Sequence, residues 1–197
     1  MTRGSRCRLP ARSFLAASVA VALLAGCAAV VVGTAVVGTA VVATDRRSVG
    51  AQADDESIEL KIANSIGTGY GDRVHVNVTS YNGIVLLTGE APSPDIVRDI
   101  GDTARTTAKV RVVHNEIVVA AASPVGSRTN DSYITSKVKT RFVEKNKFSA
   151  THVKVVTDRQ VVYLMGLVKR DEADNAAQIA STTEGVLRVV KLFEYIN

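Results

Sequence analysis

The sequence predicts an α+β protein made of two tandem copies of one α-β-β-α-β unit, which follow an N-terminal signal and a flexible tether. Three observations predict this class. Apolar residues recur with a helical period in some stretches and alternate in others. The pattern of the first copy returns about 76 residues later. The segment before the copies is apolar and of low complexity. We expect each unit to pack two helices on one face of a three-stranded mixed sheet.

Residues 1–26 are typical of a signal peptide. Arginines at positions 3, 6, 8 and 12 precede an apolar run over residues 14–24, as in the charged and hydrophobic regions of secretory signals. The run is shorter than the roughly 20 residues that span a bilayer. Leu24-Ala25-Gly26-Cys27 follows and resembles the bacterial lipobox. That resemblance implies cleavage before Cys27 and acylation of its sulfur, and the alternative is an ordinary signal with an incidental cysteine.

Residues 27–53 carry a Val-Val-Gly-Thr-Ala repeat between the cysteine and the first copy. The apolar part, residues 28–43, is short for a membrane span and rich in β-branched residues and glycine. We therefore predict a membrane-proximal tether. Acyl chains on Cys27 would anchor the protein without help from this segment.

The charge balance argues against nucleic acid as a partner. Without the four arginines of the signal, 20 basic residues face 19 acidic ones, so the high isoelectric point comes from the signal. The chain has no Trp and 5% aromatic residues, which argues against stacking platforms for bases. Its two cysteines are Cys7, in the signal, and Cys27, so we expect no disulfide within the mature chain.

Each copy opens with a predicted helix. We place the first copy at residues 54–121, the linker at 122–130 and the second copy at 131–197. Apolar residues spaced by four define the core face of each first helix: Ile58, Ile62 and Ile66, then Ile134, Val138 and Phe142. Asp55 and Asp131 stand where an N-cap is expected.

The remaining elements follow in the same order in both copies. Two alternating stretches are separated by Tyr81-Asn82-Gly83 in the first copy and by Asp158-Arg159-Gln160 in the second, which predicts a hairpin in each. A second helix is expected over 94–107 and over 171–183. A last alternating strand is expected over 113–119 and over 189–195.

These units resemble the BON (bacterial OsmY and nodulation) family. The resemblance rests on Val85-Leu86-Leu87-Thr88-Gly89, its repeat at Val162-Tyr163-Leu164-Met165-Gly166, and Gly185-Val186 before the last strand. Lys109 stands where the first copy would carry that last glycine, so we expect its final turn to be built differently. The lipobox, the tether and two such units together resemble outer-membrane lipoproteins with two BON domains.

Motifs of catalysis or metal binding are missing from the sequence. It contains no Gly-x-Ser-x-Gly elbow, no His-Glu-x-x-His and no paired cysteines for a metal. The glycines of residues 67–71 follow a helix and precede a strand, the reverse of a phosphate-binding loop, so we predict a flexible turn there. His75, His114 and His152 are scattered, and we interpret them as flanking or surface residues rather than metal ligands. We predict no enzyme activity, no cofactor and no metal.

The two copies differ in charge, with a net −4 over residues 54–120 and +3 over residues 131–197. Opposite charges favour contact between the copies, although two separate surfaces would fit as well. On the first helix of the second copy, Tyr133, Lys137, Thr140 and Arg141 share one face beside the core face. An aromatic ring beside cations suits the boundary of lipid headgroups, and an ordinary solvated face is the alternative.

The family resemblance implies phospholipid binding at those positions. It implies an outer-membrane, lipid-anchored protein facing the periplasm, whose second unit binds phosphatidylglycerol or cardiolipin and supports membrane integrity, with enrichment at division sites left open. Ala28 and Ala29 after Cys27 also favour the outer membrane. The alternative function is a protein-interaction module, in which the basic helix or an exposed strand edge docks an envelope assembly or peptidoglycan-associated partner.

Overall fold

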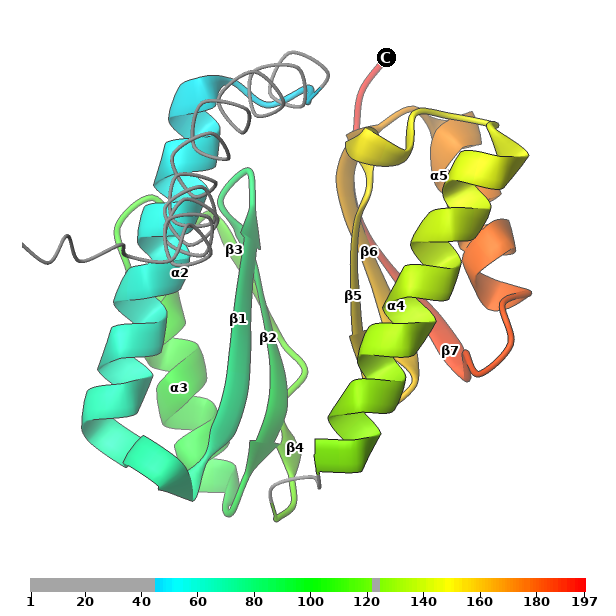
Figure 1. The fold of residues 1–197 in the computed structure, drawn as a ribbon. Helices are drawn as coiled ribbons and strands as arrows, with labels where there is room; N and C mark the ends of the chain where they lie inside the picture. Colours follow the sequence, from blue (N-terminus) through cyan, green and yellow to red (C-terminus); the bar gives the residue numbers. More distant parts are fainter. Residues whose placement is uncertain (1–44, 122–124) are drawn as a thin grey trace, which may run out of the picture. The chain divides into compact units, whose positions relative to one another are not determined.

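The structure is a computed structural model that describes residues 45–121 and 125–197 (Figure 1). The first helix in these residues is α2 (Val49–Tyr70). Ser48 is its N-cap, and the Ser48 hydroxyl accepts a hydrogen bond from the Ala51 amide. The prediction that Asp55 caps this helix is therefore wrong. Ile58, Ile62 and Ile66 lie on the buried face, as their spacing predicts.

The first domain continues with a short 3₁₀ turn, η1 (Gly71–Arg73), and the strands β1 (His75–Tyr81) and β2 (Ile84–Ala91). Helix α3 (Pro94–Thr106) follows, and β3 (Val112–Asn115) and β4 (Val118–Val119) complete the sheet. β1 pairs with β2 in antiparallel register, whereas β3 and β4 both pair with β2 in parallel. The central strand is thus β2, with α2 and α3 on one face of the sheet (Figure 1).

The predicted last strand of the first domain is interrupted between β3 and β4. The Asn115 side chain accepts a hydrogen bond from the Ile117 amide at 3.3 Å and donates one to the Val97 carbonyl at 2.8 Å. A side chain that binds nearby backbone groups competes with the strand ladder. The two parts keep the same register on β2, so the break is local.

The second domain repeats the order. Helix α4 (Val125–Lys145), the 3₁₀ turn η2 (Ala150–His152) and β5 (Lys154–Asp158) come first. The strand β6 (Val161–Val168), helix α5 (Arg170–Ser181) and β7 (Arg188–Tyr195) follow. β6 is central, antiparallel to β5 and parallel to β7. Residues 125–130, which we had assigned to the linker, form the start of α4.

Asp55 and Asp131 lie inside their helices and cap the β-hairpins instead. Asp55 accepts hydrogen bonds from the amides of Asn82 and Gly83 and from the Ser80 hydroxyl. Asp131 accepts hydrogen bonds from the backbone amides of Arg159 and Gln160 in the hairpin turn of the second domain. It lies inside α4, so the prediction that it is an N-cap is also wrong. The four turn residues, Asn82, Gly83, Arg159 and Gln160, have φ between 51° and 74°. The first helix of each domain is therefore hydrogen-bonded to the left-handed hairpin turn of the same domain.

The last turn of each domain is built alike, contrary to expectation. Lys109 takes φ 73° where the second domain has Gly185 at φ 90°. The same hydrogen bonds follow, from Val110 to Thr107 at 3.2 Å and from Val186 to Thr183 at 3.1 Å. A lysine therefore adopts the left-handed conformation that the glycine adopts more easily.

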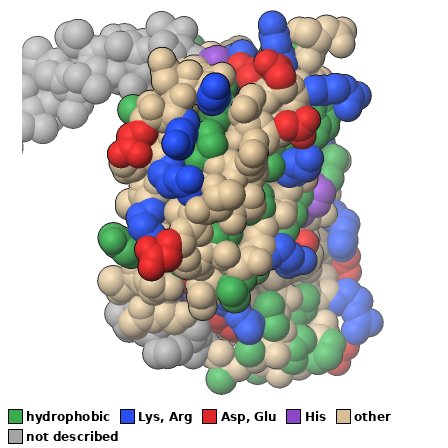
Figure 2. All heavy atoms as spheres, turned by 90° about the vertical axis from the view of Figure 1, so that its right-hand side faces the viewer, with side chains coloured by type: hydrophobic (Ala, Val, Ile, Leu, Met, Phe, Trp, Pro, Cys, Tyr) green, Lys and Arg blue, Asp and Glu red, His purple; other side chains and the backbone are tan. Residues whose placement is uncertain are grey.

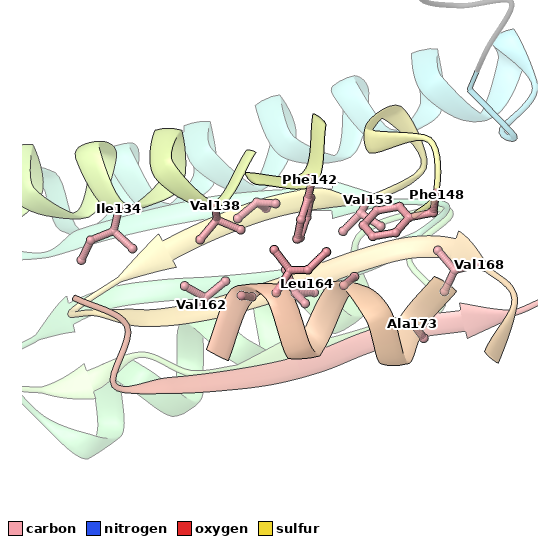
Figure 3. Packing of buried hydrophobic residues seen from close by; sticks show 13 residues of the cluster. Ile134, Val138, Phe142, Phe148, Val153, Val162, Leu164, Val168 and Ala173 are labelled. Atoms are coloured by element: carbon pink, nitrogen blue, oxygen red, sulfur yellow. The ribbon is translucent and has the colours of Figure 1, made fainter. Parts of the chain in front are cut away.

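The helices cover one face of each sheet with apolar side chains. In the second domain, Ile134, Val138 and Phe142 point from α4 toward Val162 and Leu164 of β6 (Figure 3). The Phe142 and Phe148 rings meet edge to face, with their centroids 5.0 Å apart. These contacts bury the three α4 residues almost fully, as their spacing predicts.

The other face of each central strand is also buried, because residues 45–121 and 125–197 belong to one compact unit in which the two sheets contact each other. Their shared cluster contains Tyr81 and Leu86 of the first domain and Tyr163, Met165 and Leu192 of the second. Burial on both faces explains the apolar first half of β2, residues 84–87, and the nearly continuous apolar run of β6. The α+β class and the two tandem units are confirmed.

Ion pairs surround this contact. They join Arg46 to Glu172, Arg111 to Glu194, Lys154 to Glu59 and Arg188 to Glu116. Three of the four pair an acid of one domain with a base of the other, and Arg46 belongs to the segment that precedes α2. Of the two arrangements left open by the sequence, contact between the copies is the one observed.

Candidate functional site

The four residues that we singled out on α4 line one surface hollow of about 460 Å³ beside the end of α5. Tyr133, Lys137, Thr140 and Arg141 come from one face of α4, because residues three and four apart lie together on a helix. The complete lining consists of Tyr133, Ser136, Lys137, Thr140, Arg141, Glu144, Thr182, Thr183 and Glu184. The structure thus brings all four predicted residues together.

Lys137 and Tyr133 form the first part of the hollow. The Lys137 ammonium lies 4.8 Å from the centroid of the Tyr133 ring, within the range of a cation–π contact. Tyr133 itself is 62% exposed. Lys137 also lies 3.5 Å from a carboxylate oxygen of Glu184, whose side chain is almost fully exposed. An exposed ring beside an ammonium can lie at an interface between water and a lipid surface.

Arg141 has a different environment from Lys137. Its guanidinium donates to the Ile179 carbonyl at 3.1 Å, to the Thr183 hydroxyl at 2.8 Å and to the Thr182 hydroxyl at 3.1 Å. The Ile179 carbonyl belongs to the last turn of α5, where the helix dipole favours a cation. Arg141 therefore joins α4 to the end of α5 and fixes the floor of the hollow.

A second hollow of about 290 Å³ continues from the first, and the two share Arg141 and Thr182. Lys145 and Lys147 add two cations to its lining, which also contains Asn175, Gln178 and Ile179. The first hollow contains Glu144 and Glu184 beside its two cations, whereas the lining of the second contains no acid. Figure 2 shows Lys and Arg side chains spread over this side of the second domain, with Asp and Glu between them.

The first domain offers an internal comparison, since the repeat places Ser57, Lys61, Asn64 and Ser65 at the positions of the four α4 residues. Only the lysine is shared. Ser65 donates its hydroxyl to the Lys61 carbonyl within α2, where Arg141 instead reaches another helix. The aromatic ring and the bridging guanidinium therefore belong to the second domain alone at these positions.

Sequence reasoning missed the turn after α5, which supplies Thr182, Thr183 and Glu184 to the hollow. The Gly185-Val186 motif was a signal, because Gly185 directly follows these residues and has φ 90°. This turn could not be assigned to the site without knowing how α5 ends against α4.

The other sequence features carry less chemistry. Gly67 to Tyr70 belong to α2, so the turn predicted there begins only at Gly71. His75 and His114 lie in strands and His152 in η2, and the described residues contain no group of three potential metal ligands. Within the described ranges, no helix is long and apolar enough to cross a bilayer. Cys27, the predicted acylation site, lies outside the described residues.

Comparisons with known proteins agree with the repeat. A family model for the BON domain matches residues 54–121 and 130–197. The chain is 38% identical over 184 residues to "Outer membrane lipoprotein DolP" of Haemophilus influenzae, covering 90% of this chain and 93% of that protein. It is 34% identical over 155 residues to "21 kDa hemolysin" of Actinobacillus pleuropneumoniae, covering 78% and 80%. It is also 37% identical over 73 residues to "Osmotically-inducible protein Y" of Escherichia coli, covering 36% of each.

Proposed function

The chain belongs to the BON domain family, and on that premise we propose that it is a non-enzymatic outer-membrane lipoprotein whose second domain binds anionic phospholipid. The ligand is phosphatidylglycerol or cardiolipin, and the binding site is the hollow between α4 and the end of α5. The domains lie in the periplasm, where this contact supports the integrity of the outer membrane.

The observation that carries the proposal is the grouping of Tyr133, Lys137, Thr140 and Arg141 around one hollow. Lys137 offers an ammonium for a phosphate, Tyr133 offers an exposed ring, and Thr140 offers a hydroxyl. Arg141 holds the floor in place and presents its remaining N–H groups. Each cation near an anionic membrane contributes about 1 kcal/mol, so the attachment is weak and sensitive to salt.

A lipid anchor makes weak attachment sufficient. Acylation of Cys27 holds the domains near the membrane and raises their effective concentration there. The relative named as an outer membrane lipoprotein covers nearly the whole chain, including the region of Cys27, which supports this anchor and this location. The first domain acts as a support, because its acidic charge disfavours an anionic surface.

Vesicle co-sedimentation tests the proposal. The chain from residue 27 onward, carrying Cys27→Ser so that no acyl chain contributes, is mixed with vesicles with or without phosphatidylglycerol. We expect preference for the anionic vesicles and about a fivefold loss of affinity in Lys137→Gln. The matched control is Lys61→Gln, at the equivalent position of the first domain, which should bind as the parent does. Equal binding to both vesicle types would contradict the proposal.

The second candidate function is a docking module for an envelope assembly or peptidoglycan-associated protein. The observation that favours it is the edge formed by β3 and β4, where Val112, Val118 and Val119 are exposed. Exposed edge strands are frequent sites of strand addition. Crosslinking in cells from Tyr133 and from Val119 distinguishes the two candidates. Lipid adducts at Tyr133 support the first, and protein adducts at Val119 without lipid adducts at Tyr133 support the second.

A further inference from the structure

Glu184 lies at the rim of the hollow, in the turn between α5 and β7. Its carboxylate is the acidic partner of Lys137, with 3.5 Å between the oxygen and the ammonium nitrogen. The Glu184 side chain is 95% exposed, so it contributes little to packing. Lys137, the proposed partner of the headgroup phosphate, is therefore already in contact with a carboxylate of the protein.

The position of Glu184 is set by its neighbours, although its own side chain is exposed. Thr183 is buried and accepts a hydrogen bond from Arg141. Gly185 packs against α4 so closely that a Cβ there would lie 3.2 Å from the Ile134 side chain. The turn is thus held on α4 from both sides of Glu184, which keeps its carboxylate within reach of Lys137.

Lys137 is also restrained, because its side chain is only 25% exposed and its ammonium lies over the Tyr133 ring. A phosphate that binds Lys137 at this place must displace the Glu184 carboxylate or share the ammonium with it. Because an exposed ion pair is weak, a lipid phosphate can displace the Glu184 carboxylate, but this displacement reduces the net affinity for the lipid.

We infer that Glu184 is an internal competitor for the headgroup phosphate and sets the affinity of the hollow for anionic lipid. The inference rests on the proposed function and names the residue that limits the affinity of the hollow for anionic lipid. The carboxylate pairs with Lys137 in the unbound protein and is released toward solvent when a phosphate takes its place. Removing its charge should therefore strengthen binding by more than the general effect of one lost negative charge, and this extra gain should depend on Lys137.

Glu184→Gln and Asp174→Asn form a matched pair for the test. Asp174 is also exposed and lies 3.4 Å from Lys191, but it does not line either hollow. Both variants remove one negative charge, so general attraction to an anionic surface changes alike. In the chain from residue 27 onward with Cys27→Ser, we expect Glu184→Gln to bind phosphatidylglycerol vesicles about threefold more tightly than Asp174→Asn does.

The double variant Lys137→Gln/Glu184→Gln distinguishes local competition from other effects. If Glu184 acts through Lys137, adding Glu184→Gln to Lys137→Gln strengthens binding no more than adding Asp174→Asn to it does. The inference is overturned if Glu184→Gln matches Asp174→Asn, or if its gain persists without Lys137. Failure of the parent chain to prefer anionic vesicles would instead overturn the proposed function, so the two failures give different results.

Discussion

The backbone amide of Gly83 donates a hydrogen bond to the carboxylate of Asp55 over 2.8 Å, which ties the second turn of α2 to the β1–β2 turn. Burial opposes ionisation of Asp55, but hydrogen bonds from Ser80, the turn amides and Arg47 lower its pKa below the ordinary value. The charged carboxylate is therefore the form that the fold stabilises. Asp131 makes the equivalent contacts to the turn between β5 and β6.

Removing the Asp55 carboxylate should destabilise the protein. Asp55→Ala leaves a buried hydroxyl, two turn amides and Arg47 without this acceptor, so we expect a loss of about 2–4 kcal/mol. Asp131→Ala should cost about 1–3 kcal/mol, because fewer donors are affected. Urea unfolding measures both. Glu56→Ala, on the exposed side of α2, is the control, and an equal loss in the control would contradict the assigned role.

The sequence pattern singled out both aspartates, but as helix N-caps and not as the caps of the hairpin turns that they are. Their place near the start of an apolar helical period is typical of an N-cap. The structure instead begins α2 after Ser48 and α4 at Val125. The hairpin partners of Asp55 lie 25 to 28 residues away along the chain. Contacts at that separation depend on how the helix packs on the sheet, which local patterns do not report.

Lys109 and Gly185 give a second test, because they occupy the same turn in the two domains. Gly185→Ala should destabilise the protein by about 1–2 kcal/mol, since a Cβ is disfavoured at φ 90° and would crowd Ile134. Lys109→Gly should leave stability unchanged or raise it by up to about 1 kcal/mol, because glycine adopts φ 73° without strain. Thermal unfolding measures both. A marked loss in Lys109→Gly would show that its side chain matters more than its backbone.

Acid should weaken the contact of Arg46 with the second domain. Hydrogen bonds from Arg46 lower the pKa of Glu172 from 4.5 to about 2 despite its burial. Because the pKa is lower in the folded state, this stabilisation is present above about pH 4.5 and is lost as the pH falls toward 2. Its upper limit is about 3 kcal/mol.

Urea unfolding of the parent chain and of Glu172→Gln measures that effect. The parent should be the more stable at about pH 6, and the difference should shrink as the pH is lowered to about 3. His152 also faces Glu172, at 3.6 Å, so His152→Gln should be compared to separate its charge from that of Arg46. A difference that stays constant over this range would contradict the account.

The α4 part of the candidate site follows from helical periodicity alone. Ile134, Val138 and Phe142 fix which side of α4 is buried, and this places Tyr133, Lys137, Thr140 and Arg141 together on the outside. The remaining part, Thr182 to Glu184, comes from a turn more than 40 residues away along the chain. Those residues join the site because Arg141 binds the end of α5, a tertiary contact with no periodic signal.

A fluorophore at position 133 would report whether this face of α4 meets the lipid surface. Cys27→Ser leaves the chain from residue 27 onward without cysteine, so Tyr133→Cys or Ser57→Cys carries a polarity-sensitive fluorophore at one site. Position 57 is the equivalent of 133 in the first domain. With phosphatidylglycerol vesicles, we expect the fluorescence to shift toward an apolar environment at position 133 and not at position 57. With zwitterionic vesicles, we expect no shift at either position. A shift at position 57 alone, or no shift at position 133 while the protein is bound, would contradict the proposal.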